Sequence, residues 1–292
     1  MQRRLPLLLL CCCLAVLLAC KLKRSGGSAA SATSAGSSSV PTATPPSEVT
    51  FKPKIPTPGT SSNVTRSLGL KLTMGKDAYR QNSFEKLKLT VKAADDVRIT
   101  KALLDIEEKY ETKQEGVAAE KKTVSPLAGS KFIVSRDDAG KVTAIDPDGT
   151  AVTASQVKLL QEDFAGIFKK DTVGAFLPDR SLKLGEKLNP SASSLMQMME
   201  IKDDGKTTVD GIEVIFTSVE GGNARFSMAF TLTMGLTGGL RMRAKLNGQL
   251  TLQIATVWLV SAALSGPVTV LDGKGDEKGR GDMKLAIDQT FN

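Results

Sequence analysis

The sequence predicts a mainly β domain of the α+β class, a curved antiparallel sheet or half-barrel meander with one principal amphipathic helix. Apolar and polar residues alternate along several segments, which is typical of strands with one buried face. Turn residues recur between these segments, as in Asp148-Gly149 and Gly221-Gly222-Asn223. Strands separated by short turns favour antiparallel meanders over alternating strands and helices. Helical periodicity stands out in one stretch, which begins at Thr153.

The alternation of apolar and polar residues is stronger in some predicted strands than in others. Alternation is clearest in four segments, residues 68–72, 87–91, 226–232 and 242–246. Residues 250–271 are apolar enough to resemble a membrane segment, but Gln253, Gly266 and Pro267 interrupt them. Two buried strands are the better interpretation of this run.

The predicted helix has a start signal and an apolar stripe. Thr153 and Gln156 form a capping box, in which each side chain bonds the backbone of the other. The stripe that follows is Val157, Leu160, Phe164, Ile167 and Phe168. Lys169 and Lys170 suit the negative end of the helix dipole. Residues 191–199 are compatible with a second short helix or with a strand.

The N-terminus has the pattern of a secretory signal. A basic start at Arg3-Arg4 precedes an apolar run from Leu5 to Ala19, which ends at Cys20. The alternative is an uncleaved signal anchor, but the run is shorter than the roughly 20 residues that span a bilayer. We therefore predict a signal peptide over residues 1–19.

Leu17-Leu18-Ala19-Cys20 resembles the lipobox of bacterial lipoproteins. The resemblance implies that Cys20 carries a covalent acyl and diacylglycerol lipid and becomes the first residue of the mature chain. It further implies export and membrane anchoring, at the outer membrane where the host has two membranes. No other cofactor is predicted.

A low-complexity segment follows the cysteine. Ser, Gly, Ala, Thr and Pro dominate from Ser25 to Thr65, with apolar residues too sparse to bury a core. We predict a disordered tether over residues 20–65 and a single β-rich domain over residues 66–292. A coil of this length spans about 35–40 Å, which places the domain clear of the lipid headgroups.

The basic charge does not indicate a nucleic-acid partner. Lys and Arg number 39 against 31 Asp and Glu, but much of the excess lies outside the predicted domain. Residues 21–65 hold several cations against Glu48 alone: Lys21, Lys23, Arg24, Lys52 and Lys54. Cations beside the anchor would favour an anionic membrane surface.

Catalytic motifs are weak in this chain. It has no histidine, and no cysteine follows Cys20, so a Ser-His-Asp triad and thiolate or histidine zinc sites are excluded. Ser155 and Lys158 have the spacing of the nucleophile motif in serine β-lactamases, but its companion motifs do not occur. We predict a non-enzymatic protein, with a Ser-Lys dyad hydrolase as the alternative.

Two groups of residues are candidates for a ligand site. Met228, Met234 and Met242, with Phe164 and Phe168, are candidates for the lining of an apolar cleft, and ordinary core packing is the alternative. Arg241, Arg243 and Lys245 share one strand face. They are a candidate rim for anionic lipid headgroups, and a solvated face is the alternative.

The architecture as a whole is similar to Lol-type lipid carriers, in which a curved antiparallel sheet wraps helices around an apolar cavity. This resemblance implies a sheet and helix cleft that binds lipid or another apolar ligand. The predicted function is therefore a membrane-anchored, non-enzymatic envelope lipoprotein. The alternative is a protein-interaction or assembly scaffold of the cell envelope.

Overall fold

The computed structural model describes residues 48–137, 139–168, 176–178, 180–199 and 205–292. The predicted signal peptide, the lipobox with Cys20 and the tether as far as residue 47 lie outside the described residues. The prediction of a mainly β fold is confirmed, because the core of the structure is one 12-stranded antiparallel sheet.

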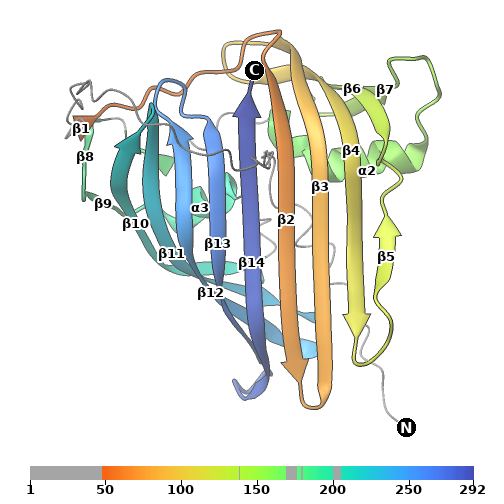
Figure 1. The fold of residues 1–292 in the computed structure, drawn as a ribbon, viewed down its shortest axis with the longest axis vertical. Coiled ribbons are helices and arrows are strands. Elements are labelled where there is room, and N and C mark those ends of the chain that lie inside the picture. Colours follow the sequence, from red (N-terminus) through yellow and green to blue (C-terminus); the bar gives the residue numbers. More distant parts are fainter. Residues whose placement is uncertain (1–47, 138, 169–175, 179, 200–204) are drawn as a thin grey trace, which may run out of the picture.

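The sheet has the strand order β7-β6-β4-β3-β2-β14-β13-β12-β11-β10-β9, and β5 pairs with β4 off this path (Figure 1). Its strands are β2 (Ser61–Met74), β3 (Asp77–Ala94), β4 (Ile99–Glu115), β5 (Lys121–Val124), β6 (Ser130–Arg136), β7 (Val142–Ile145), β9 (Lys187–Leu188), β10 (Thr208–Glu220), β11 (Asn223–Gly235), β12 (Arg241–Gln253), β13 (Leu259–Leu271) and β14 (Glu277–Phe291). β1 (Glu48–Val49) and β8 (Leu182–Lys183) form a separate two-stranded ribbon.

Two meanders meet at the centre of the sheet. The first strand of one meander, β2, pairs with the last strand of the other, β14 (Figure 1). In this pairing Leu68 lies opposite Leu285 and Arg66 lies opposite Ile287. The chain therefore joins its two halves through contacts between residues more than two hundred positions apart in sequence.

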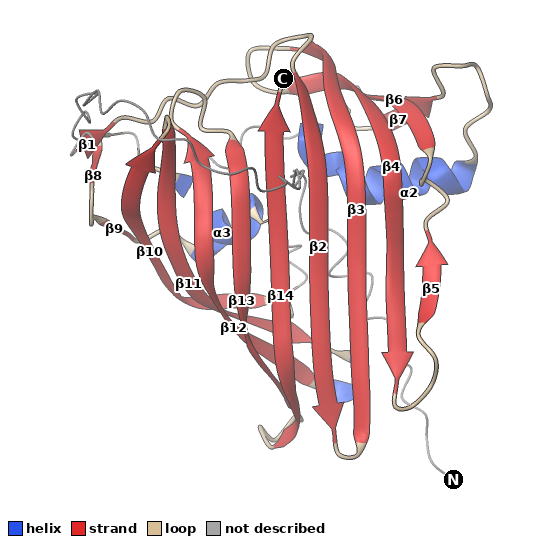
Figure 2. Cartoon of the chain, in the orientation of Figure 1, coloured by secondary structure: helices blue, strands red, loops and turns tan. Residues whose placement is uncertain are grey.

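Two helices lie on the same face of the sheet (Figure 2). They are α2 (Ala154–Phe164), which continues into the 3-10 turn η2 (Ala165–Phe168), and α3 (Ala192–Met198). α2 contacts β7 and α3 contacts β10. A second 3-10 turn, η4 (Thr237–Gly239), connects β11 to β12. The face that carries the helices is called the inner face here.

The capping box of the principal helix is confirmed. The Thr153 amide donates to Gln156 Oε1 at 3.0 Å, and the Gln156 amide donates to Thr153 Oγ1 at 3.2 Å. Leu160, Phe164 and Phe168 of the predicted stripe are buried. Lys169 and Lys170 lie outside the described residues. The segment around residue 195, compatible with helix or strand in the sequence, is the helix α3.

Buried apolar residues form two separate clusters on the inner face. The α2 cluster consists of Val64, Leu87, Leu104, Ile106, Leu127, Phe132, Val134, Val142, Leu160, Phe164 and Phe168. The larger α3 cluster includes Phe51, Leu68, Leu70, Leu72, Tyr79, Leu195, Met199, Phe216, Phe226, Met228, Met234, Met242, Met283 and Leu285. Each helix thus packs on its own part of the core.

The folded region begins before the predicted domain boundary at Arg66. The Phe51 ring is buried, with its centroid 6.0 Å from that of Phe216 and 5.9 Å from that of Phe226. The Trp258 indole N–H donates to the Lys54 carbonyl at 2.6 Å. The expectation of a disordered tether is therefore wrong for residues 48–65. Its few apolar residues cannot bury one another, but they pack on strands that are distant in sequence.

Three glycines allow neighbouring strand backbones to approach closely. A Cβ added at Gly248 would lie 1.8 Å from the Ala263 carbonyl oxygen, and one at Gly266 would lie 1.8 Å from that of Lys245. A Cβ at Gly281 would lie 1.7 Å from the Lys71 oxygen. Glycine inside strands marks bends and close backbone contacts. These positions on β12, β13 and β14 therefore accept no side chain without a shift of the strands.

Gly266→Ala should destabilise the domain because its methyl group overlaps a carbonyl oxygen of β12. The expected loss in the free energy of unfolding is about 1–3 kcal/mol or more, as for overpacked cores. Gly273→Ala is the matched control, because its Cβ would meet its nearest atom at 3.9 Å. Urea unfolding followed by circular dichroism would measure both variants, and equal stability of the two would contradict the role of close approach.

Candidate functional site

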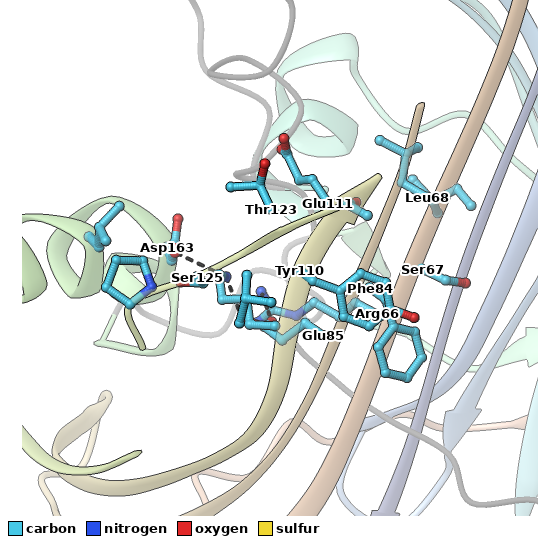
Figure 3. Close-up of a pocket in the computed structure, with 16 residues that line it drawn as sticks. Arg66, Ser67, Leu68, Phe84, Glu85, Tyr110, Glu111, Thr123, Ser125 and Asp163 are labelled. Carbon is cyan, nitrogen blue, oxygen red and sulfur yellow. Dashed lines mark hydrogen bonds and ion pairs between the residues drawn. The ribbon is translucent and has the colours of Figure 1, made fainter. Parts of the chain in front are cut away.

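Three charged side chains lie side by side on the inner face. Arg66 of β2 pairs in register with Glu85 of β3, and Glu85 pairs with Lys109 of β4. Because residues opposite one another in a sheet point to the same face, the three form a continuous row. Asp163 of α2 completes it from the helix side (Figure 3). We call these four residues the charge row.

Ion pairs connect the charge row from end to end. Arg66 Nη1 lies 2.9 Å from Glu85 Oε2, and Lys109 Nζ lies 2.5 Å from Glu85 Oε1. Lys109 Nζ also lies 3.0 Å from Asp163 Oδ2. Two cations thus alternate with two carboxylates. An isolated buried ion loses several kcal/mol of solvation, and alternation offsets much of that cost.

Three residues of the charge row are buried, Lys109 is partly buried, and the row separates the two apolar clusters. Arg66 is 7% exposed, Glu85 4% and Asp163 8%. Along β2, Val64 on one side of Arg66 belongs to the α2 cluster, and Leu68 on the other side belongs to the α3 cluster. The core is therefore interrupted by charge where the two meanders join.

Arg66 keeps two donor groups without a hydrogen-bond partner. Nε and Nη2 are buried and bond none of the described residues, and Glu85 Oε2 accepts no hydrogen bond despite its ion pair. The Arg66 guanidinium carbon lies 5.6 Å from the centre of the Phe164 ring, and Lys109 Nζ lies 5.4 Å from it. A buried donor left unmet costs roughly 1–3 kcal/mol. Unmet buried donors of this kind are rare in native proteins.

The pKa of Asp163 is raised above its usual value of 3.8. Burial is the largest cause, because it disfavours the ionised carboxylate. The positive charge of Lys109 opposes this shift, and the negative charge of Glu85 adds to it. The protonated form of Asp163 is therefore favoured relative to an exposed aspartate.

A cavity of about 270 Å³ lies beside the charge row, between the sheet and α2 (Figure 3). We call it the α2 cavity. Its apolar lining includes Leu68, Pro126, Leu159 and Leu285. Its polar lining includes the four residues of the charge row, Glu111 and three hydroxyl residues, Ser83, Thr123 and Ser125. Apolar walls with a few polar groups are typical of small-molecule sites.

The residues predicted to line an apolar cleft are divided between the two clusters. Met228, Met234 and Met242 are buried in the α3 cluster, whereas Phe164 and Phe168 are buried in the α2 cluster. None of the five lines the α2 cavity. Phe164 contacts the charge row through its ring. The structure therefore does not bring this set together in one cleft.

The predicted cationic rim lies on the opposite face of the sheet. Arg241, Arg243 and Lys245 are exposed and alternate with buried Met242 and Ala244. The buried partners face the helices, so the three cations point away from the α2 cavity. They do not line it.

The candidate dyad residues are both exposed at the start of α2. Ser155 Oγ lies 3.0 Å from Thr153 Oγ1, within the helix cap. Lys158 Nζ lies 3.9 Å from Glu162 Oε1 on the next turn. Neither residue lines the α2 cavity. Within the described part of the chain, no group of three or more potential ligands could hold a metal ion.

No family model matches the sequence, and no curated protein matches it. A structure titled as lipid–protein interactions in lipovitellin aligns at a TM-score of 0.39 with 10% identity, covering 80% of this chain and 25% of the other. The chain thus spans about a quarter of that lipovitellin chain.

Two further structures align at lower scores. DynF from the dynemicin biosynthesis pathway of Micromonospora chersina has a TM-score of 0.25 and 10% identity, covering 89% of this chain and 92% of the other. A DUF1329 family protein from Desulfovibrio piger has a TM-score of 0.12 and 8% identity, covering 80% and 85%. All these TM-scores are too low to assign a fold or a function.

The raised pKa of Asp163 predicts a pH-dependent effect on stability. The folded state binds this proton more tightly than the unfolded chain, so stability from this group falls as pH rises from 3.8 through the folded pKa. Asp163→Asn removes the titration. The unfolding free energy of the wild type minus that of the variant should therefore decrease over this range, measured by urea unfolding at successive pH values.

Asp272→Asn is the control of opposite sign. Its hydrogen bond with Lys278 lowers the pKa of Asp272, so the corresponding difference should increase as pH rises toward 3.8. An increase for Asp163 as well would show that its carboxylate is stabilised in the folded state, contrary to the structure.

Proposed function

We propose that this chain is a non-enzymatic envelope lipoprotein, anchored through Cys20, that holds an apolar or amphiphilic ligand in the α2 cavity. The observation that supports the proposal best is the α2 cavity itself, which combines apolar lining residues such as Leu68, Leu159 and Leu285 with the charge row. Its volume of about 270 Å³ is close to the lower end of the range for ligand pockets, about 300–1,000 Å³.

The apolar walls come from rigid parts of the fold. Leu68 and Leu285 lie opposite one another on the paired central strands β2 and β14, and Leu159 belongs to α2. Positions on strands and helices hold a ligand more reproducibly than positions on loops. This arrangement supports binding of a preferred ligand rather than nonspecific adhesion.

A second candidate function is assembly through a sheet edge. β5 is fully exposed and pairs with β4 alone, and Val124 at its end is 59% exposed. An unpaired edge can accept a strand from another protein. Lys121 and Lys122 on the same strand are of the type that prevents edge-to-edge association. The α2 cavity therefore supports ligand binding better than β5 supports assembly.

The proposed anchor depends on the N-terminal sequence. No helix in the described residues is long and apolar enough to cross a bilayer. The sequence predicts a coil for the part of the tether that precedes residue 48, and a coil of that length would have an end-to-end distance of roughly 30 Å. That reach would still hold the domain clear of the headgroups.

Cys20→Ser tests the anchor. Two or more acyl chains give stable membrane attachment, and the variant cannot carry them on sulfur. We expect it to leave the membrane fraction after cleavage, or to remain an unprocessed precursor. Fractionation with immunoblotting and intact mass measures both outcomes. Cys13→Ser, inside the predicted signal peptide, should behave as the wild type. Continued membrane association of the cleaved Cys20→Ser protein would contradict the anchor.

Ser83→Leu tests the α2 cavity, because a leucine side chain would fill part of its volume. Crowding of about 1–3 kcal/mol would weaken a bound ligand by roughly 5- to 150-fold. The full-length protein would be purified from envelope membranes, extracted without hydrolysis and assayed for noncovalent lipid by mass spectrometry. We expect less extracted ligand per protein than from the wild type.

Thr73→Leu is the matched control, because Thr73 is exposed on β2 and lines neither the α2 cavity nor the pocket next to it. It should retain the ligand content of the wild type. Membrane lipid carried over nonspecifically would appear equally in all three proteins. Identical content in all three, or no extractable amphiphile in any, would overturn the proposed function.

A further inference from the structure

A second cavity lies between the sheet and η2, where β14 ends and β2 begins (Figure 1). Its volume is about 200 Å³, and we call it the η2 cavity. None of the described residues lines both this cavity and the α2 cavity. Along β2, Val64 of the α2 cluster lies between Ser62, which lines the η2 cavity, and Arg66, which lines the α2 cavity. The two cavities are therefore separate sites.

Apolar side chains make up most of the wall of the η2 cavity. The sheet, η2 and the segment before β2 contribute Leu89, Val91, Ile99, Phe291, Ile167 and Pro56. None of the described residues that line the cavity is charged. A charged ligand would lose its hydration there without gaining a partner of opposite charge, at a large cost in free energy. The wall therefore favours an uncharged ligand.

Two polar side chains in this wall are buried and unpaired. Gln289 is 7% exposed and Ser62 is 4% exposed. Neither side chain forms a hydrogen bond with the described residues. Ser62 pairs in register with Leu89, and Gln289 pairs with buried Val64, so both side chains lie on the inner face. The η2 cavity thus has an amide and a hydroxyl group that no protein atom satisfies.

The polar atoms of these two side chains are accessible. Among the described residues, the fully enclosed side-chain atoms without a hydrogen bond belong to Arg66 and Glu85. The amide of Gln289 and the hydroxyl of Ser62 are not in that set, and both residues line the η2 cavity. A molecule in the cavity can therefore reach them. Buried polar groups without a protein partner are normally bonded to water or to a ligand.

The chemistry of the two groups restricts the ligand. The Gln289 amide donates through its nitrogen and accepts through its oxygen, and the Ser62 hydroxyl also does both. A hydroxyl or a carboxamide of the ligand has the same double capacity. A ligand without a polar group would displace water from Gln289 and Ser62 without replacing its hydrogen bonds, which loses affinity.

The segment before β2 forms a fixed part of the wall. The Gly59 amide donates to the Val91 carbonyl at 2.9 Å, and the Val91 amide donates to the Thr60 carbonyl at 2.9 Å. Pro56, which lines the cavity, lies between these bonds and the contact of Lys54 with Trp258. The wall is therefore held from both sides, as a selective site requires.

We propose that the η2 cavity binds a small uncharged molecule whose apolar body carries one hydroxyl or carboxamide group, bonded by Gln289 and Ser62. This site goes beyond the proposed function, because it does not depend on the α2 cavity. An engineered apolar cavity of about 150 Å³ binds benzene. A volume of about 200 Å³ therefore fits a single ring with one small polar substituent.

Trp258 provides a signal that is specific to this site. It is the only tryptophan in the sequence, and its ring centroid lies 4.6 Å from that of Phe291 in the cavity wall. Its indole N–H donates to the carbonyl of Lys54, close to Pro56. A ligand in the η2 cavity should shift the single indole N–H signal in the NMR spectrum.

The test compares four probes with the same ring: benzyl alcohol, benzamide, toluene and benzoate. The labelled full chain with Cys20→Ser would be titrated with each probe in detergent-free buffer. We expect benzyl alcohol or benzamide to shift the Trp258 signal to saturation. Benzoate should bind at least about tenfold more weakly, because its charge would be buried without a partner. The preference between benzyl alcohol and benzamide identifies the polar group.

Gln289→Leu, introduced into the same chain, removes the amide and keeps a side chain of similar size. The affinity for benzyl alcohol relative to toluene should fall by roughly 2- to 13-fold, the range for one uncharged hydrogen bond. Thr290→Leu is the matched control, because Thr290 is the next residue of β14, is exposed and does not line the cavity. Ser83→Leu, in the α2 cavity, should also keep the ratio of the parent.

The outcomes decide the inference separately from the proposed function. It is wrong if no probe shifts the Trp258 signal, if benzoate binds as tightly as benzyl alcohol, or if folded Gln289→Leu keeps the ratio of the parent. Circular dichroism would check folding. If Gln289→Leu does not fold, Ser62→Ala must lower the same ratio for the inference to stand. A lack of extractable ligand in the α2 cavity would overturn the proposed function and leave these results unchanged.

Discussion

Close approach between strand backbones is the constraint on which the rest of this structure depends. The two helices, of 11 and 7 residues, are too short to cover the inner face of a 12-stranded sheet. The sheet must therefore curve and cover much of its own apolar face. Gly248, Gly266 and Gly281 have no side chain, and neighbouring strand backbones come together at these positions. Met234 and Met242 of the C-terminal strands consequently share a cluster with Leu70, Leu72 and Tyr79 of the N-terminal strands.

The charge row lies where this apolar covering is interrupted. A row of leucines between the two clusters would join them into one core at lower cost, because replacing buried ion pairs by apolar residues is often neutral or stabilising. The chain instead buries Arg66, Glu85 and Asp163 there and leaves two Arg66 donors unmet. Local departures from the best packing concentrate at functional sites. The cavity beside the charge row is where such a departure would serve the proposed ligand binding.

The sequence predicts local features of this fold well and long-range ones poorly. The strand alternation and the Thr153–Gln156 cap depend on neighbours within a few residues, and both are present in the structure. Phe51 was expected in a disordered tether because its burial depends on Phe216 and Phe226, far along the chain. The sequence does not predict Arg66 as a site residue, although Arg66 lies on the same strand face as Leu68 and Leu70. Alternation alone does not show which charged residue has a buried partner of opposite charge.

The cations of the sheet differ in how strongly water and salt screen their charge. Arg241, Arg243 and Lys245 keep their hydration on the outer face, where salt screens their attraction for an anion. Arg66 is largely desolvated, and hydrogen bonds are electrostatically stronger in such surroundings than in water. The ion pair of Arg66 with Glu85 is therefore screened less by salt than any contact that the three outer cations could make.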